Sequence, residues 1–297
     1  MKQNVITRRD FLRGSVATTL AVTMGLPLEI NAEAEVKKKT KVVLIRDTDI
    51  FDRKGHINPK VIQHMLDKAV TALVGKEDPV KAWKYLVKPH DIVGIKSNVW
   101  GPLPTPTEVE STLKRRSIDA GVLEGNIGID DRGVLKNRIF LNSTALVNVR
   151  PFRTHHWSGV GGCIKNYIMF TSWPPLYHPD SCSDLGAVWK LPIVKDKTRL
   201  NVLVMLNPLF HGIGVHHFDS TYTWSYKGIL VGTDPVALDA VGLKIFELKR
   251  RAYFGEDIPL KPSAKHIAIA DIKHKLGTSD LKEIELLKLG WMEEILI

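Results

Sequence analysis

The chain has 297 residues, of which 44% are hydrophobic and 25% are charged, and its formal net charge is +10. These values exclude a largely disordered chain and allow a sizeable core. The length suits one large domain or two small ones. A basic chain attracts anionic partners, but no nucleic-acid reader motif and no basic stripe with interleaved aromatic residues is present. We therefore expect an anionic ligand and no nucleic-acid partner.

The amino terminus has the order of an export signal. The segment "TRRDFLRG" precedes the weakly apolar run "SVATTLAVTMGLPL", and "NAEAEV" supplies an A-x-A cleavage pattern. The paired arginines resemble the twin-arginine signal. We predict a signal peptide over residues 1–34, recognition by the twin-arginine translocase, and a periplasmic mature protein. An uncleaved amino-terminal anchor is the alternative, and no later stretch is apolar enough to span a membrane.

The chain contains two cysteines, Cys163 and Cys182. An iron–sulfur cluster usually needs four thiolates, so we expect no such cluster in this chain alone. In an oxidising compartment the pair could form a disulfide, which spacing alone does not decide. Because Cys163 follows a flexible glycine pair, we favour two unbridged thiols, with metal ligation as another reading.

Short apolar runs alternate with helical patterns along the mature chain. We predict strands at 42–47, 91–98, 145–152, 200–206, 228–234 and 266–271. We predict helices at 59–75, 107–119, 235–250 and 279–290. This alternation is typical of an α/β fold with a largely parallel sheet and helices on both faces. Residues 35–297 are expected to form a single domain, and the long segment 172–197 is expected to be a cap or lid.

Polar side chains follow the predicted strands where each strand ends. Ligands of open parallel sheets bind beyond the carboxyl ends of the strands. If the sheet is parallel, these residues converge at one edge: Asp47, Asp49, Asn98, Trp100, Arg153, His155, His156, Asn207, His211, Thr233 and Asp234. Each of them could instead be a turn former or a helix cap.

The segment "GGCIKN" combines flexible backbone with charge. Gly161 and Gly162, with Gly159 before them, can present free N–H groups as an anion-binding nest. Lys165 adds a positive charge, and Asn166 adds a donor and an acceptor. The alternative is a flexible turn whose lysine is solvated.

Several histidines lie close together in the sequence and suggest a transition-metal site. We select His155, His156 and His211 as candidate ligands because neutral imidazoles bind such metals. No H-E-x-x-H or comparable spacing is present. A structural role for each histidine is the alternative.

The segment "VGTDPVALDAVG" carries two aspartates. Asp234 can cap a helix that begins at Pro235. Asp239 lies one turn later among apolar residues, where a carboxylate is costly unless it is paired or functional. We consider both as proton-transfer groups or metal ligands, with a buried salt bridge as the alternative for Asp239.

Four segments together resemble an uncharacterised family built on a domain of unknown function. They are "VGIKSNVWG", "GGCIKNYIMF", "KTRLNVLVMLNPLF" and "GILVGTDPVALDAVG". The resemblance covers roughly residues 40 to 290, and its motif positions are Lys96, Asn98, Lys165, Asn166, Asp234 and Asp239. Some members of the family are fused to ferredoxin-type iron–sulfur domains, and others carry a twin-arginine signal. The resemblance therefore implies redox chemistry, although this chain lacks the cysteine-rich domain.

Three functions are consistent with these patterns. The leading hypothesis is an exported enzyme that acts on a small anionic substrate, with a metal or redox cofactor as a candidate addition. Its catalytic groups would be Lys165, Asp234 and Asp239. Its ligand-binding residues would be Lys96, Asn98, Gly161, Gly162 and Asn166. The alternatives are a binding protein for an anion or cofactor without turnover, and an accessory protein that docks on a periplasmic redox partner protein.

Overall fold

The computed structural model describes residues 39–212 and 218–297. The predicted signal peptide, residues 1–34, lies outside the described residues. The expected fold class is confirmed, because an eight-stranded and mostly parallel sheet carries helices around it.

The sheet is mixed rather than fully parallel. Its neighbours run in the order β3 (Ile127–Asp130), β2 (Val93–Lys96), β4 (Ala145–His155), β6 (Thr198–Leu209), β7 (Gly228–Gly232), β1 (Thr40–Arg46) and β8 (Ile284–Gly290). A short strand, β5 (Gly159–Gly161), pairs antiparallel with the end of β4. Strands β3, β2, β4 and β6 are mutually parallel. Strand β7 runs antiparallel to both of its neighbours, β6 and β1.

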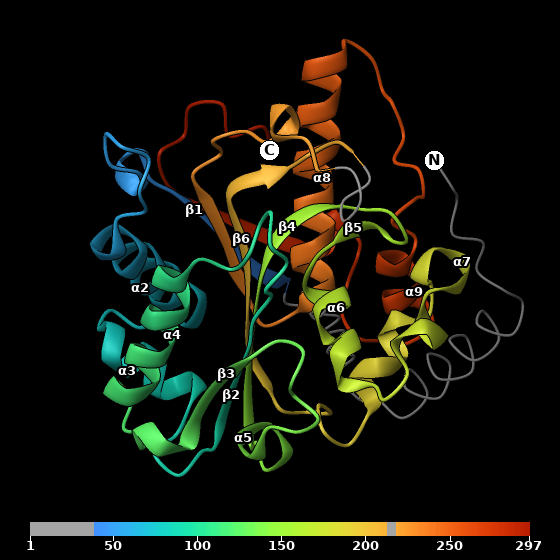
Figure 1. The fold of residues 1–297 in the computed structure, drawn as a ribbon. Helices are drawn as coiled ribbons and strands as arrows, with labels where there is room; N and C mark the ends of the chain where they lie inside the picture. The colour runs from blue at the N-terminus through green and yellow to red at the C-terminus, as the bar shows by residue number, and fades with distance from the viewer. Residues whose placement is uncertain (1–38, 213–217) are drawn as a thin grey trace, which may run out of the picture. The chain divides into compact units, whose positions relative to one another are not determined.

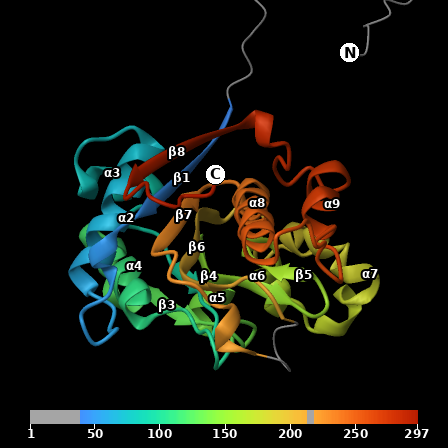
Figure 2. The same cartoon turned by 90° about the horizontal axis from the view of Figure 1, so that it is seen from above.

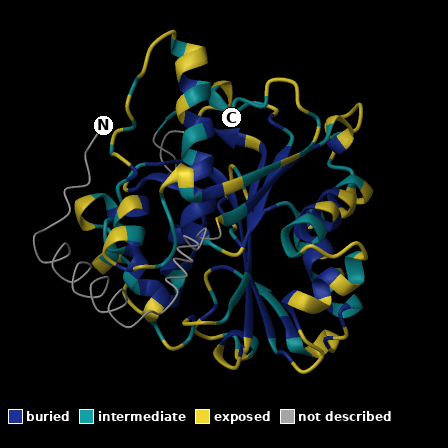
Figure 3. Ribbon diagram, turned by 180° about the vertical axis from the view of Figure 1, so that it is seen from behind, coloured by how far each residue is buried: buried dark blue, intermediate teal, exposed yellow. Residues whose placement is uncertain are grey.

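Helices cover both faces of the sheet (Figure 1). One face carries α2 (Pro59–Val74), α3 (Pro79–Leu86) and α4 (Thr107–Asp119). The other carries α6 (Cys163–Asn166) and α8 (Pro235–Phe254), with α9 (His266–Ile272) beside α8 (Figure 2). Alternate residues of β1 point to opposite faces of the sheet. Val43 and Ile45 pack in the hydrophobic core beneath α2, α3 and α4, and Val42 and Leu44 pack in the core beneath α8. Both faces of the central strands are therefore buried (Figure 3).

The remaining elements are short. They are the helices α5 (Arg138–Leu141) and α7 (Pro179–Cys182) and the 3₁₀ turns η1 (Thr48–Ile50), η2 (Glu124–Asn126), η3 (Tyr167–Phe170), η4 (Pro174–Tyr177), η5 (Leu185–Lys190), η6 (Ser220–Tyr222) and η7 (Leu281–Glu283). No helix among the described residues is long and apolar enough to cross a membrane.

Residues that cap helix ends explain why the helices predicted at 59–75 and 235–250 are present. The side chain of Asn58 accepts a hydrogen bond from the Lys60 amide at the start of α2, and Pro59 occupies the first turn. Gly75 ends α2 in the left-handed region, with φ of 67°. Asp234 caps α8 by accepting from the Val236 and Ala237 amides.

Two predicted elements near the carboxyl terminus were wrong. Residues 266–271 form helix α9 rather than a strand, since His266, Ile267 and Ala270 are buried at helical spacing. Residues 279–290 contain η7 and strand β8 rather than a helix, because 284–290 pairs in parallel with β1 at the edge of the sheet. That pairing partner lies more than two hundred residues earlier, so the local pattern does not reveal it. Helix α3 and strand β3 were not predicted.

The direction of β7 corrects a second expectation. Thr233 and Asp234 were expected to meet the other strand-end residues at one edge of the sheet. Because β7 is antiparallel to β6, its carboxyl end lies at the opposite edge from the ends of β2, β4 and β6. Asp234 is thus separated from the polar residues that follow those strands.

The segment 172–197 packs beside α6. Leu185, Val188 and Trp189 are buried, and the Trp189 indole donates a hydrogen bond of 3.2 Å to the Ile164 carbonyl. Pro174 and His178 reach the wall of a pocket described below. The segment thus closes one side of that pocket, while its motion as a lid stays a prediction.

Candidate functional site

A pocket of about 240 Å³ lies where β2 and β4 end and α6 begins. We call it the cationic pocket. It is lined by Asn98, Trp100, Asp131, Arg132, Arg150, Arg153, His155, Trp157, Lys165, Asn166, Ile168, Met169, Pro174 and His178. Four of these side chains are arginine or lysine, and one is a carboxylate. Its small volume suits a small ion better than a drug-sized molecule.

Lys165 is buried in the wall of this pocket. Its ammonium group contacts Cys182 Sγ at 3.5 Å, and no ion pair of this lysine is found among the described residues. Burial, aided by the nearby Arg150 and opposed by Cys182, lowers the pKa of Lys165 to about 8. Burial also raises the pKa of the Cys182 thiol, so this neighbour is a neutral thiol at pH 7. The lysine charge is therefore not neutralised within the described structure.

Two arginines of β4 add buried positive charge. Arg150 and Arg153 are each only 3% exposed, and the Nε atoms of both have no hydrogen-bond partner among the described residues. Arg153 Nη1 donates to the Thr154 carbonyl at 3.3 Å, and its guanidinium lies 3.9 Å from the centre of the Trp100 ring. Burial lowers the pKa of both arginines, and for Arg153 the charge of Arg150 acts in the same direction. Donors that lack acceptors in a closed pocket favour the entry of an anion.

Asp131, the carboxylate of the lining, is already engaged. Its Oδ1 accepts from the Lys96 ammonium, and its Oδ2 accepts from the Val99 amide at 3.0 Å. Burial alone would raise the pKa of Asp131, but Lys96 and this amide hold it below the ordinary value. Burial lowers the pKa of Lys96 to about 8, and Asp131 opposes that shift. Asp131 and Lys96 thus form a buried ion pair. Asp131 also attracts Arg150 and Arg153, but neither arginine forms an ion pair among the described residues.

Amide side chains fix the floor of the pocket. Asn166 Nδ2 donates to the Lys96 carbonyl, the Val149 carbonyl and Asn148 Oδ1, at 2.8–3.1 Å. Asn166 Oδ1 lies 3.4 Å from the Lys96 ammonium. Asn166 therefore ties α6 to strands β2 and β4. Asn98 lies at the rim, and its buried Oδ1 has no partner among the described residues.

The turn before α6 binds a carboxylate of the chain itself. Both oxygens of Asp239 accept backbone hydrogen bonds at the start of α6, from the Cys163 amide at 2.6 Å and from the Ile164 amide at 2.9 Å. The predicted anion nest at Gly161 and Gly162 is therefore filled by an internal anion. A Cβ atom on Gly162 would overlap this carboxylate, and one on Gly161 would lie 2.5 Å from Arg150 Nη2. The two glycines leave room for side chains of the protein rather than presenting free amides.

The two candidate aspartates do not line the cationic pocket. Asp239 is fully buried, and burial raises its pKa to about 7, although the two amide bonds oppose the shift. Asp234 accepts from the first amides of α8 and from the Thr278 amide. Both carboxylates hold helix ends in this structure, and their catalytic role stays a prediction.

The candidate metal-binding histidines do not form one cluster. His155 and His156 stack with ring centres 4.7 Å apart, whereas His211 lies against Arg250, with 2.9 Å between His211 Nδ1 and Arg250 Nη1. Within residues 39–212 and 218–297, no group of three or more histidine, cysteine or acidic side chains has the geometry of a metal site. Cys163 and Cys182 are both free and buried.

The imidazoles at the pocket are neutral at pH 7. Burial, together with the charge of Lys165, lowers the pKa of His178 to about 4. Burial and Lys165 also lower the pKa of His155, whose Nδ1 accepts from the Trp157 amide at 3.2 Å. Neutral imidazoles can exchange hydrogen bonds with a ligand without adding charge.

The site therefore defines an α/β protein with a buried cationic pocket at the carboxyl edge of its sheet. Residues 129–244 match the family model of a domain of unknown function, DUF362. This range contains β4, α6 and β6, together with Lys165, Asp234 and Asp239, whereas Lys96 and Asn98 precede it. A domain of the expected uncharacterised kind is thus present. No curated protein and no solved structure matches the chain.

Several residues named from the sequence line the cationic pocket, whereas Asp131, Arg132 and Arg150 line it without having been singled out. Lys96, Asn98, Lys165, Asn166 and His155 lie in or directly beside the cationic pocket. Arg150 was not singled out because it lies inside a strand rather than after one. A charged residue within the apolar run "ALVNVRPF" was the signal that could have identified it.

Proposed function

We propose that the cationic pocket binds a small anion, such as a carboxylate or a phosphate. The supporting observation is a set of three buried cations that form no ion pair among the described residues: Arg150, Arg153 and Lys165. A buried charge without a partner is strongly destabilising, so a bound anion would stabilise the folded protein.

We propose further that the protein is an enzyme and that Lys165 exchanges a proton with the bound anion. A group is most effective in acid–base catalysis when its pKa lies near the working pH. The pKa of Lys165, about 8, satisfies this condition, and His155 and His178 lie in the same pocket as neutral hydrogen-bonding groups. The reaction class would be proton transfer on a small anionic substrate. A binding protein without turnover is the alternative, and mass spectrometry of ligand recovered after incubation separates the two.

The binding step can be tested by isothermal titration with phosphate, sulfate and small carboxylates. The informative variant is Lys165→Met, which keeps the length of the side chain and removes its charge. We expect its affinity for the best anion to fall by about tenfold or more, because a charge-assisted hydrogen bond is lost. The stability of its ligand-free form should not fall, since a buried unpaired charge is removed.

Lys190→Met provides the matched control. Lys190 is an exposed residue of η5, in the same segment as the pocket residues Pro174 and His178, but it does not line the pocket. This variant should bind the anion like the wild type. Unchanged affinity in Lys165→Met would contradict the proposal.

We also propose that the protein is exported by the twin-arginine route, which rests on the order of the motifs in residues 1–34. The double change Arg8→Lys with Arg9→Lys should leave the precursor in the cytoplasm. Cell fractionation that finds normal periplasmic mature protein would contradict this proposal.

A further inference from the structure

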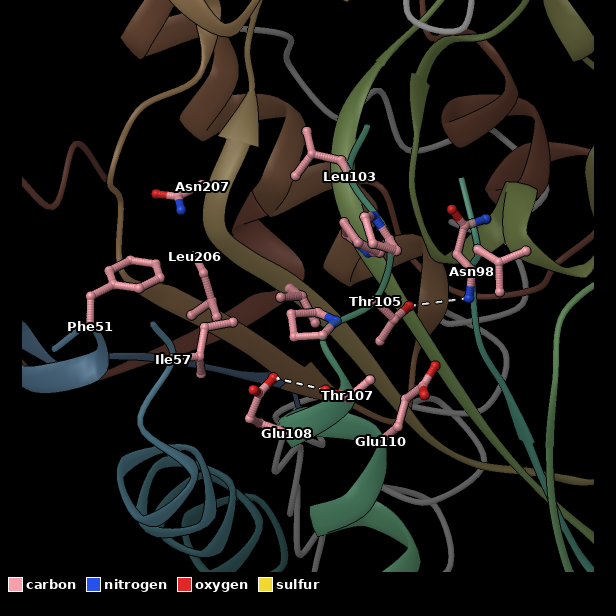
Figure 4. Close-up of a pocket in the computed structure, with 15 residues that line it drawn as sticks. Phe51, Ile57, Asn98, Leu103, Thr105, Thr107, Glu108, Glu110, Leu206 and Asn207 are labelled. Carbon is pink, nitrogen blue, oxygen red and sulfur yellow. Dashed lines mark hydrogen bonds between the residues drawn. The ribbon is translucent and has the colours of Figure 1, made fainter. Parts of the chain in front are cut away.

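A second cavity, which we call the apolar cleft, lies beside the cationic pocket. Its volume is about 510 Å³, within the range of small-molecule sites. Figure 4 shows it between η1, the start of α4 and the end of β6. Its lining residues are Phe51, Ile57, Asn98, Val99, Leu103, Pro104, Thr105, Pro106, Thr107, Glu108, Glu110, Pro151, Val204, Leu206 and Asn207.

The charge of this cleft is opposite to that of the cationic pocket. Among the described residues, its lining contains no lysine, arginine or histidine, but it contains two carboxylates, Glu108 and Glu110. This is unexpected in a chain whose formal net charge is +10. The two cavities share one wall residue, Asn98.

Glu110 is the more informative of the two carboxylates. It is half-buried, it accepts a hydrogen bond from the Ser97 hydroxyl, and it has no ion-pair partner among the described residues. Burial raises the pKa of Glu110, and the charge of Asp131 acts in the same direction. Glu108 also lines a separate surface pocket outside the apolar cleft. Lys60 and Arg115 line that pocket as well, so Glu108 has basic residues nearby.

The position of Glu110 in the first turns of α4 explains only part of its placement. The positive end of a helix dipole stabilises a carboxylate there, but this free energy is smaller than the cost of burying an unpaired charge. An unsatisfied acceptor also belongs to this lining, because the buried Asn98 Oδ1 has no partner among the described residues. A ligand that donates hydrogen bonds and carries positive charge would serve both groups.

We propose that the apolar cleft binds an organic cation: a primary amine on an apolar body. The apolar body would contact Ile57, Leu103 and Leu206, and the ammonium group would pair with Glu110. This site is separate from the anion site of the proposed function and does not depend on it.

Phenylbutylamine and phenylbutanol form a matched pair of probes for this site. They share an apolar body and differ in charge. Titration calorimetry of the full chain at neutral pH should show that the amine binds at least about tenfold more tightly than the alcohol, because it forms one additional charge-assisted hydrogen bond. Equal affinity for the two probes would overturn the proposal.

Three variants locate the binding. Glu110→Gln retains an acceptor for Ser97 but removes the charge, and it should bring the affinity for the amine down to that for the alcohol. Leu103→Trp should weaken both probes by filling the cleft. Glu77→Gln, on an exposed glutamate outside the cleft, should change neither affinity. Amine binding that survives both Glu110→Gln and Leu103→Trp would place the amine elsewhere and overturn the proposal.

Discussion

The start of α6 and the cationic pocket beside it contain buried charges of two different kinds. Asp239 is fully buried, but both of its oxygens accept backbone hydrogen bonds, from the Cys163 and Ile164 amides. Lys165, which lies two residues after Cys163, is nearly as buried, and its one hydrogen bond among the described residues is to the neutral thiol of Cys182. Burial alone thus does not distinguish a structural charge from a functional one.

Asp239 and Lys165 differ in whether the protein itself supplies hydrogen-bond partners for the buried charge. A carboxylate that accepts two amide hydrogen bonds is stabilised within the fold and has little capacity left for a ligand. A lysine or arginine whose donors lack acceptors remains available to one. Substitutions at the start of α6 and at Lys165 test this distinction.

Asp239→Ala should produce the largest loss of stability. It leaves two buried amides without an acceptor, and we expect the free energy of unfolding to fall by about 2–5 kcal/mol. Asp239→Asn keeps one acceptor oxygen and should lose about half as much. Urea-induced unfolding measures both changes. A stability of Asp239→Ala within about 0.5 kcal/mol of the wild type would show that these hydrogen bonds are not structural.

Gly162→Ala tests the packing between the turn before α6 and the Asp239 carboxylate. The added methyl group would overlap the Asp239 carboxylate, and overpacking of this kind costs about 1–3 kcal/mol. Gly125→Ala is the matched control, because a Cβ atom at that exposed glycine meets nothing within 4 Å. Thermal unfolding should separate the two variants, and equal melting temperatures would refute the packing argument.

The pH dependence tests the cationic pocket. The folded pKa of Lys165, about 8, lies below its ordinary value of 10.5. Between these values the unfolded chain binds more protons, so stability of the ligand-free protein should rise with pH. Anion affinity should do the opposite and fall above pH 8, by up to about tenfold per pH unit, because binding needs the ammonium form.

The control for this pH profile is Lys165→Met. It should flatten the decline in affinity above pH 8, although Lys96, whose pKa is also about 8, can leave a residual slope. A wild-type affinity that stays constant from pH 7 to pH 10 would contradict the role of Lys165.

The sequence predicted those parts of the fold that depend on local signals. Helices α2, α4 and α8 carry caps, prolines or periodic apolar faces within their own residues, and the buried strands are continuous apolar runs. The direction of β7 could not be predicted, because an apolar run reads the same in a parallel and an antiparallel pair. The edge strand β8 depends on a partner at the other end of the chain.

The site shows the same division. The rule that ligands bind at the carboxyl ends of parallel strands placed Asn98, Arg153 and His155 near one another, whereas Lys165 and Asn166 were selected from their own motif. It misplaced Asp234, since that rule depends on strand direction. The glycine pair was predicted to bind a ligand anion, but the amides that follow it bind Asp239, which no local pattern connects to the turn.

The most direct test of the central claim is a crystal structure grown with selenate, whose selenium atom is located by anomalous scattering. We predict a selenate in the cationic pocket, within hydrogen-bond distance of Lys165 and of Arg150 or Arg153. The same experiment with Lys165→Met should show this site empty or weakly occupied. Wild-type crystals in which selenate binds only outside this pocket would contradict the account.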